Sequence, residues 1–446
     1  MALKSAPAWL TLLFLLIWIS PSRLPAQEKS AQREPDPRHE TDNVIRFYQW
    51  RVARDPDDYF NYDKLGSAYL RKGRETGDVS YYERAEQVLK KSLELESTHR
   101  EAISATLHLG TVCFAEHRFH EALAYTRKAL DFNTGDVSPR AVEGDVLLEL
   151  GDYDGAASAY SKLDRSGPST ATNSALSYLR ETRRSNLEHF RGNPEASVLH
   201  MRNAVRIAVD ARMPAETIAW TQFSLGEEYF QTGDLENAGQ ATESALAVFP
   251  GYYRALAGLA KVRVAQDRLE EAIALYKQAL AAVPVPTDAA ALGDVYAKLG
   301  RTADARRQYD LVEFIAQLSA LSKTVYNREL ALFYADHDIR LSEAVTLAQK
   351  ELEVRRDVYT WDTLAWAFYK DAETGEAVRA MERALSRGTK DALIFYHAGL
   401  IYERAGDTEK AKQFLRRALS TNPHFHIFYA ESAAKILRQL EMPSGR

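Results

Sequence analysis

Apolar residues recur every three to four positions along most of the chain, which predicts amphipathic helices rather than strands. Thr41 to Arg54 is an example, with Val44, Phe47 and Tyr48 at helical spacing. Gly-Asp pairs such as Gly233-Asp234 interrupt the pattern, because glycine ends a helix in a left-handed turn and aspartate caps the next one. The pattern therefore predicts an all-α chain of successive helical hairpins.

One sequence unit recurs through the chain. Residues 225–250 (LGEEYFQTGDLENAGQATESALAVFP) align without a gap to residues 398–423 (AGLIYERAGDTEKAKQFLRRALSTNP). The coinciding positions are Gly226 and Gly399, Tyr229 and Tyr402, Gly233 and Gly406, Ala238 and Ala411, Ala245 and Ala418, and Pro250 and Pro423. From Ala365 to Gly399 the step is 34 residues. This spacing of small residues, aromatic residue, turn glycine and closing proline resembles the tetratricopeptide repeat family.

The resemblance implies a right-handed α-solenoid of about ten helix-turn-helix repeats with capping helices at both ends. A single hairpin cannot bury its apolar faces, so neighbouring repeats stack into one continuous core. We divide the chain into a signal peptide (1–26), a disordered linker (27–40), an N-terminal capping helix (41–58), repeats one to three (59–164), a degenerate, extended fourth repeat (165–216), repeats five to ten (217–424), and a C-terminal capping helix with a tail (425–446).

The start of the chain has the features of a secretory signal peptide. Lys4 precedes an apolar run from Trp9 to Ile19, and small residues follow up to Ala26. This run is shorter than the roughly 20 apolar residues that a helix needs to cross a bilayer. We expect an exported protein of the bacterial type, in the periplasm or at the cell surface. The alternative is an uncleaved signal anchor at residues 5–22 in the inner membrane.

Composition and motifs argue against a catalytic, cofactor-binding or metal-binding site. The formal net charge is -5, and a chain without a basic surplus is not expected to bind nucleic acid. Cys113 is the only cysteine, which excludes an intramolecular disulfide and a CxxC site. No GxxxxGK[ST], GxSxG or HExxH motif is present, and we interpret His117 and His120 as solvated side chains at a helix turn. We predict no catalytic, cofactor-binding or metal-binding residues.

In tetratricopeptide proteins a peptide binds on the concave face of the first helices. The positions are three and six before the small residue, and one, four and five after it. Carried onto this chain, the resemblance implies the partner-binding residues Trp220, Phe223, Phe230, Arg328, Tyr359, Asp362, Trp366, Tyr369, Lys370, Tyr396, Glu403 and Arg404. The Lys and Asn residues with which some members clamp a terminal carboxylate are absent, because those slots hold Arg328, Leu332, Asp362 and Trp366.

The sequence thus predicts a non-catalytic scaffold that binds a segment of an envelope or secreted protein in the concave groove. We expect contact with a membrane only if the signal segment is retained, in which case the chain is a membrane-anchored assembly factor. Two further alternatives are a glycan-binding protein and an enzyme acting on envelope polymers. In these, Trp366 and Tyr396 stack on sugars, and in the enzyme Asp362 is the candidate acid. Trp366→Ala is expected to spare folding and weaken partner capture.

Overall fold

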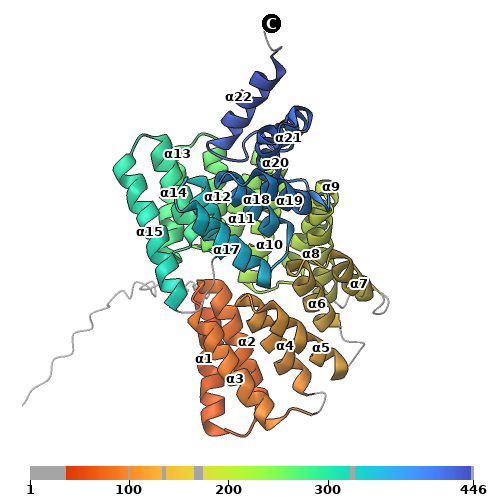
Figure 1. Cartoon of the computed structure of the whole chain (residues 1–446). Helices are drawn as coiled ribbons and strands as arrows, with labels where there is room; N and C mark the ends of the chain where they lie inside the picture. Colours follow the sequence, from red (N-terminus) through yellow and green to blue (C-terminus); the bar gives the residue numbers. More distant parts are fainter. Residues whose placement is uncertain (1–36, 99–100, 133–136, 165–173, 322–326, 443–446) are drawn as a thin grey trace, which may run out of the picture. The chain divides into compact units, whose positions relative to one another are not determined.

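A computed structural model describes residues 37–98, 101–132, 137–164, 174–321 and 327–442 of the chain. These described residues form 22 α-helices and no strand (Figure 1), which confirms the predicted all-α fold. The predicted signal peptide and residues 27–36 of the predicted linker lie outside the described residues.

The helices follow one another with short connections. They are α1 (Pro37–Arg54), α2 (Tyr59–Thr76), α3 (Ser80–Leu95), α4 (Ala102–Ala115), α5 (Phe119–Phe132), α6 (Val137–Glu149), α7 (Tyr153–Asp164), α8 (Ser174–Phe190), α9 (Pro194–Asp210), α10 (Ala215–Gln231), α11 (Leu235–Val248), α12 (Tyr253–Ala265), α13 (Leu269–Ala282), α14 (Pro286–Lys298), α15 (Thr302–Leu321), α16 (Asn327–Asp336), α17 (Leu341–Val354), α18 (Val358–Lys370), α19 (Thr374–Leu385), α20 (Ala392–Arg404), α21 (Thr408–Thr421) and α22 (Tyr429–Glu441).

Ten hairpins, from α2–α3 to α20–α21, make up repeats 1 to 10, and α1 and α22 flank them. Within each hairpin the two helices pack together, and in most repeats the second helix also packs on the first helix of the next repeat. The first helices of several neighbouring repeats also touch each other, for example α10 with α12 and α18 with α20. We call the first helices α2, α4 and so on to α20 the inner helices, and their shared surface the inner face.

The predicted register of small residues is visible in the packing of each hairpin. A Cβ atom added to Gly66 would lie 2.5 Å from Leu89 Cγ, and one added to Gly144 would lie 2.2 Å from Tyr160 Cε1. The alanines at the corresponding positions of other repeats, such as Ala365, have no exposed surface. Small residues are therefore required where the two helices of a hairpin cross, because a larger side chain would push them apart.

Two boundaries and the fourth repeat refine the sequence-based division. Helix α1 begins at Pro37, so the end of the predicted linker is helical. In the fourth repeat α8 and α9 have 17 residues each, longer than the 13 residues of α12, α14, α18 and α20. That hairpin places two serines at its crossing, and the Oγ atoms of Ser185 and Ser197 lie 3.0 Å apart. The closing helix begins at Tyr429 rather than at Phe425.

The array of repeats 3 to 10 curves back on itself. The Tyr153 hydroxyl accepts a hydrogen bond from Val358 N at 2.9 Å, and Thr389 Oγ1 donates to the Phe190 carbonyl at 2.7 Å. These partners are 205 and 199 residues apart, close to six repeats of 34 residues. Where the two parts meet, a Cβ on Gly192 would lie 2.1 Å from the Gly388 carbonyl oxygen, so the contact tolerates only glycine.

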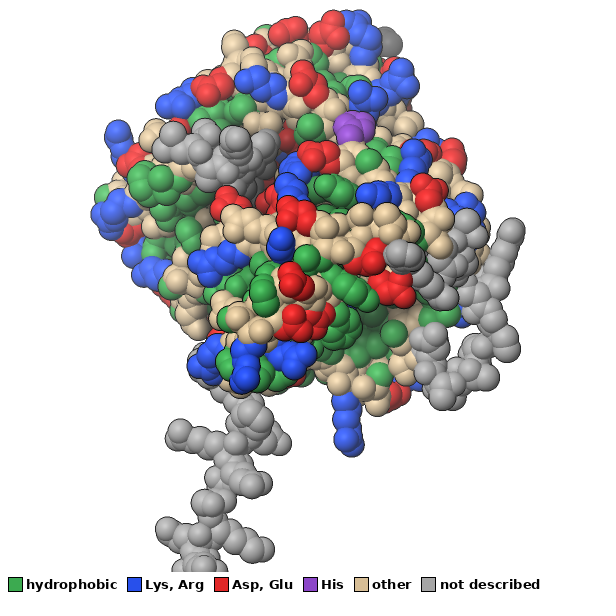
Figure 2. Space-filling model, turned by 90° about the horizontal axis from the view of Figure 1, so that it is seen from below, with side chains coloured by type: hydrophobic (Ala, Val, Ile, Leu, Met, Phe, Trp, Pro, Cys, Tyr) green, Lys and Arg blue, Asp and Glu red, His purple; other side chains and the backbone are tan. Residues whose placement is uncertain are grey.

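The outer surface carries charge of both signs. Figure 2 shows basic and acidic side chains interspersed with polar and apolar ones over the face that is seen from below. Mixed charge of this kind is typical of a solvated protein surface.

Candidate functional site

Neighbouring inner helices are joined by pairs of an acidic and a basic side chain. In each of these pairs the acid lies on the earlier inner helix, and the base lies on the next inner helix or, for His337, directly after its end. They are Asp63 with His108 (2.7 Å), Asp145 with Arg183 (2.6 Å), Glu227 with Lys261 (2.9 Å), Asp294 with His337 (3.0 Å), and Asp362 with His397 (3.0 Å). We call these contacts the inner-face pairs. They satisfy polar groups that are removed from bulk water between the helices.

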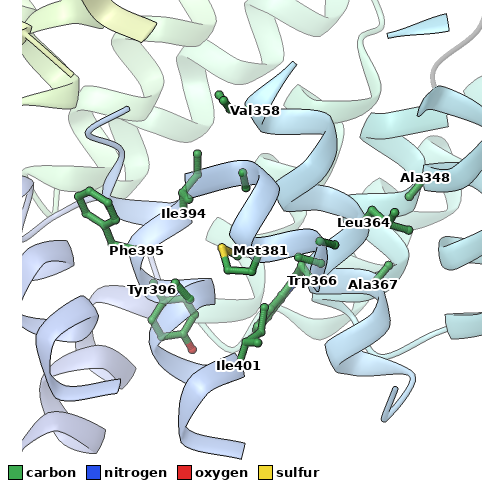
Figure 3. Close-up of a cluster of buried hydrophobic side chains, with 14 of the residues drawn as sticks. Ala348, Val358, Leu364, Trp366, Ala367, Met381, Ile394, Phe395, Tyr396 and Ile401 are labelled. Atoms are coloured by element: carbon green, nitrogen blue, oxygen red, sulfur yellow. The ribbon is translucent and has the colours of Figure 1, made fainter. Parts of the chain in front are cut away.

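The inner face of repeats 9 and 10 is filled with aromatic side chains. Trp366 lies in the middle of this cluster, between α18 and α20 (Figure 3). Its ring is stacked on His397 with a centroid separation of 4.1 Å and on Tyr369 at 4.9 Å. Its Nε1 donates a hydrogen bond to Asp336 Oδ1 at 2.8 Å. Stacking and the satisfied indole N–H together make Trp366 a core residue.

The end of the chain covers this cluster. The ring of Tyr429, the first residue of α22, stacks on Tyr396 at 4.7 Å, and its hydroxyl donates to Asp336 Oδ1 at 2.8 Å. Phe425 contacts Tyr396 from the preceding turn, at a centroid distance of 5.8 Å. We call Phe425–Tyr429 the C-terminal cover. Asp336 therefore holds Trp366 and the C-terminal cover at the same time.

Because of these contacts, part of the predicted groove is buried. Asp362, Trp366, Tyr396 and Phe230 are 4%, 1%, 3% and 4% exposed, so they do not line an open surface in this structure. Large aromatic side chains on adjacent inner helices bury one another, and the C-terminal cover buries them further. The same burial leaves Trp366 and Tyr396 no free ring face on which a sugar can stack.

Other residues predicted to bind a partner in the late repeats have internal partners. The hydroxyl of Tyr359 lies 2.6 Å from His189 Nε2 on α8, and burial raises the pKa of Tyr359 well above its ordinary value. Arg328 forms an ion pair with Asp357 at 3.2 Å, and Lys370 forms one with Asp338 at 2.7 Å. The structure therefore assigns these side chains structural contacts, and their role in binding stays a prediction.

The remaining predicted residues differ in accessibility. Glu403 and Arg404 are exposed, and the guanidinium of Arg404 lies 3.6 Å from the ring centroid of Tyr369. Trp220 and Phe223 on α10 are half-buried. Phe223 lines a pocket on the inner face.

That pocket has a volume of about 360 Å³ and lies between the inner helices α10, α12 and α14 of repeats 5 to 7. Its lining consists of Phe223, Glu227, Tyr253, Arg254, Ala257, Gly258, Lys261, Tyr276, Val285, Thr287, Asp288 and Ala291. Small residues keep it open, because a Cβ on Gly258 would lie 2.8 Å from Phe223 Cε2. We call it the inner pocket.

The charges of the inner pocket are only partly paired. Lys261 binds Glu227 and also lies 4.1 Å from the ring centroid of Phe230. Arg254 is exposed and lies over the ring of Tyr253 at 5.2 Å, and no described residue forms an ion pair or hydrogen bond with its guanidinium. Burial raises the pKa of the Asp288 carboxyl to about 7; Arg254 opposes this rise, and Glu227 adds to it.

Arg254 and Lys261 are not among the residues predicted from the sequence, although the positions that define the inner face include them. They stand six before and one after Ala260, the small residue of the sixth repeat, which are two of the positions used for the other copies. Applying the same positions to repeat 6 finds both. Asp288 is not at such a position, and it reaches the pocket because α14 packs on α13, next to α12 in the array.

Other parts of the described chain offer less to a ligand. A second pocket between α7, α8 and α9 is lined by Arg180, Arg184 and His200, and all three already have partners: the Leu163 carbonyl, Asp164 and Glu181. Cys113 is fully buried, and burial raises the pKa of its thiol to about 12. Within the described ranges there is no cluster of three or more His, Cys, Asp and Glu side chains suited to a metal ion. No helix in those same ranges combines the length and apolar character needed to span a membrane.

Comparison with known proteins identifies the repeat unit. Residues 229–292 and residues 392–425 each match a sequence model described as tetratricopeptide repeat. These stretches are tetratricopeptide repeats. The first runs from the end of α10 into α14 and so contains most of the inner pocket, and the second covers repeat 10.

Similarity to individual proteins is low. The chain is 26% identical over 218 residues to the CTR9 homolog of Arabidopsis thaliana, a match that covers 46% of this chain and 19% of that protein. The chain thus spans about a fifth of the length of this relative.

Three solved structures are similar in their arrangement of helices. The Cut9-Hcn1 hetero-tetramer of the APC/C has a TM-score of 0.39 at 16% identity, covering 91% of this chain and 83% of that chain. Yeast Tom70 has a TM-score of 0.34 at 12% identity, covering 85% and 96%. A tetratricopeptide repeat protein from Parabacteroides merdae has a TM-score of 0.35 at 18% identity, covering 60% and 99%.

Proposed function

We propose that this chain is a non-catalytic scaffold that binds a segment of a partner protein at the inner face of repeats 5 to 7. The inner pocket carries the proposal, because it is an accessible concavity with aromatic walls and an unpaired cation on a helical repeat. Pockets that combine apolar walls with a few polar groups are favoured binding sites. The tetratricopeptide repeat match at residues 229–292, which contains most of this pocket, suggests protein-protein interaction.

The proposal moves the binding site from the late repeats to the middle of the array. At the predicted site of repeats 9 and 10, the C-terminal cover packs on Tyr396 and is hydrogen-bonded to Asp336, which favours a site elsewhere on the inner face. Phe223 is the predicted residue that lies in the wall of the inner pocket. Trp220, one helical turn earlier on α10, packs against the neighbouring cluster of Phe249, Tyr252 and Tyr253.

The test is capture of partners in cells by crosslinking, followed by their identification. Ala291→Leu adds three carbon atoms to the wall of the inner pocket and should abolish capture of the specific partner. Ala247→Leu makes the same change at an exposed position of α11 and should retain it. Both variants should show helical circular dichroism spectra and melting temperatures like those of the wild type. Capture of the same proteins by both variants would contradict binding in the inner pocket.

For the cellular location, we propose export through the N-terminal segment, with residues 5–22 as a retained membrane anchor in the alternative case. The support is the sequence of that segment. N-terminal sequencing of the chain recovered from its own cells distinguishes the two. A new N-terminus near residue 27 indicates cleavage, and an intact N-terminus in the membrane fraction indicates the anchor. An intact chain in the cytosol contradicts export.

A further inference from the structure

We infer that the inner pocket receives an acidic side chain of the partner segment, whose carboxylate pairs with Arg254. This inference rests on the proposed function, because it names the chemistry that the same pocket recognises. It is drawn from how Arg254 differs from the other basic residues of the inner face.

Arg254 differs from the basic residues of the inner-face pairs, because those residues each have an acidic partner. On α8 and α12, Arg183 and Lys261 each contact a carboxylate of the preceding inner helix at 2.6 and 2.9 Å. Arg254 also lies on α12, but no described carboxylate pairs with it. A guanidinium is always charged and offers several donors in one plane, so it is suited to bind a carboxylate through two hydrogen bonds.

The nearby acids do not satisfy Arg254. Glu227 is already paired with Lys261. Asp288 lines the same pocket and is close enough for Arg254 to lower the pKa of its carboxyl, yet the two side chains form no ion pair. Glu216 also acts on Arg254 through its charge, but it is paired with Arg74 at 3.5 Å. Arg254 therefore lies beside open volume without a carboxylate in direct contact, which favours an anionic group of a ligand.

A side chain is the expected source of that anionic group. The pocket lies in repeats 5 to 7, in the middle of an array of ten, with inner helices on both sides. A segment that runs along the inner face crosses the pocket with a side chain, whereas a terminal carboxylate requires the segment to end there. A glutamate or aspartate on an otherwise partly apolar segment fits both Arg254 and the aromatic wall of Phe223 and Tyr253.

The experiment compares binding of labelled peptide pools to the purified full chain by fluorescence anisotropy. One pool has a central glutamate with randomised neighbours and blocked ends, the second has glutamine instead, and the third has the central glutamine with a free terminal carboxylate. The glutamate pool should bind about tenfold more tightly than the glutamine pool, since hydrogen bonds to charged groups are the stronger ones.

Variants of the chain test whether Arg254 causes the preference for the glutamate pool. Arg254→Gln should bring the glutamate pool down to the affinity of the glutamine pool, because it removes the charge but keeps a donor. Arg206→Gln, at an exposed position of α9, should leave the preference unchanged. Ala291→Leu should abolish binding of all pools.

Several outcomes would overturn the inference. The glutamate and glutamine pools could bind with equal affinity, and Ala291→Leu could abolish the binding of both. This result would reject recognition of a carboxylate but would agree with the scaffold function. A glutamate preference that survives Arg254→Gln would place the carboxylate elsewhere. Tighter binding of the free-terminus pool would reject the side chain as the source. Absence of binding to the glutamate pool would also reject the inference. If the partner captured in cells still depends on Ala291, the scaffold function survives that result.

A second readout uses pH. The charged and titratable groups around Asp288 are Arg254 and Lys261 from α12, Glu227 from α10, Tyr253 and Tyr276. Burial raises the pKa of Asp288 to about 7, so this carboxyl ionises between pH 6 and pH 8, and its ionised form repels a bound carboxylate. The glutamate pool should therefore bind more tightly at pH 6 than at pH 8. Asp288→Asn should remove this dependence, and an unchanged dependence in that variant would contradict the assigned position of the carboxylate.

Discussion

The inner faces of repeats 5 to 7 and of repeats 9 and 10 are built from the same unit and have opposite properties. In repeat 9 the position after the small residue holds Trp366, which is stacked, hydrogen-bonded and buried. In repeat 6 the same position holds Lys261, which is paired with Glu227 at the edge of an open pocket. The register of the repeat therefore determines where a side chain points, while its size and its neighbours determine whether the surface stays open.

The C-terminal cover accentuates this difference. Tyr429 stacks on Tyr396 and Phe425 contacts the same ring, as residues of a next inner helix would. Repeat arrays need their last apolar face shielded, and here the shield extends onto the inner face. The following experiments test whether the late repeats are core and the middle repeats are surface.

The largest effect is expected for Trp366→Ala. It removes two ring stacks and leaves Asp336 without the indole donor, so the free energy of unfolding should fall by about 3–5 kcal/mol. Phe223→Ala, in the half-buried wall of the inner pocket, should lower the free energy of unfolding by clearly less than Trp366→Ala does. The measurement is denaturant unfolding of both variants. Equal losses would erase the distinction between the two regions.

A smaller loss, about 1 kcal/mol, is expected for Tyr429→Phe, because this change removes the hydrogen bond from the C-terminal cover to Asp336 and leaves the ring stack in place. Tyr402→Phe is the matched control, since the Tyr402 ring packs on Phe414 and no described residue is hydrogen-bonded to its hydroxyl. Urea titrations should show a lower midpoint for Tyr429→Phe only. An unchanged midpoint would show that the cover is held by stacking alone.

The pH dependence of stability should reveal the cost of keeping the inner pocket open. The pKa of Asp288 is about 7 in the folded chain, above its unfolded value of about 4. Its contribution to stability is therefore full below pH ~4 and is lost as the pH rises through ~7. Asp288→Asn should be more stable than the wild type at pH 8, with the difference vanishing near pH 4. A constant difference across this range would contradict the raised pKa.

The smallest effect is expected for Arg254→Gln. Because no described residue pairs with Arg254, its loss should change the free energy of unfolding by less than about 0.5 kcal/mol. Arg183→Gln provides the contrast, since it leaves Asp145 without its partner at 2.6 Å and should be markedly destabilising. Thermal melts of the two variants compare them directly. A large loss for Arg254→Gln would assign that side chain a structural role.

Much of the fold could be predicted because the repeat is a local pattern. Gly66, Gly144 and Ala365 mark the crossings of their hairpins, and the structure places each of them in a tight contact. The hairpin of α8 and α9 was predicted as a degenerate repeat, and serines at its crossing explain why its sequence matches the pattern poorly.

The site was predicted less well, because accessibility depends on residues far apart in sequence. The rule for the inner face correctly put Trp366 and Tyr396 on the inner helices. It contained nothing about Tyr429, which covers them, or about His189, which binds Tyr359 from 170 residues away. Trp366→Ala was accordingly predicted to spare folding, whereas its buried contacts predict the opposite.

The sequence by itself determined the all-α repeat, its register and the helices that face inward, since these follow from periodicity and from the small residues that helix crossings require. Only the tertiary structure decided which part of the inner face is open. That depends on how aromatic side chains of successive repeats and the C-terminal cover fill the space, and on Arg254 and Asp288 lying in one pocket without pairing. Packing and electrostatics between distant segments are set by the whole array, and no single repeat encodes them.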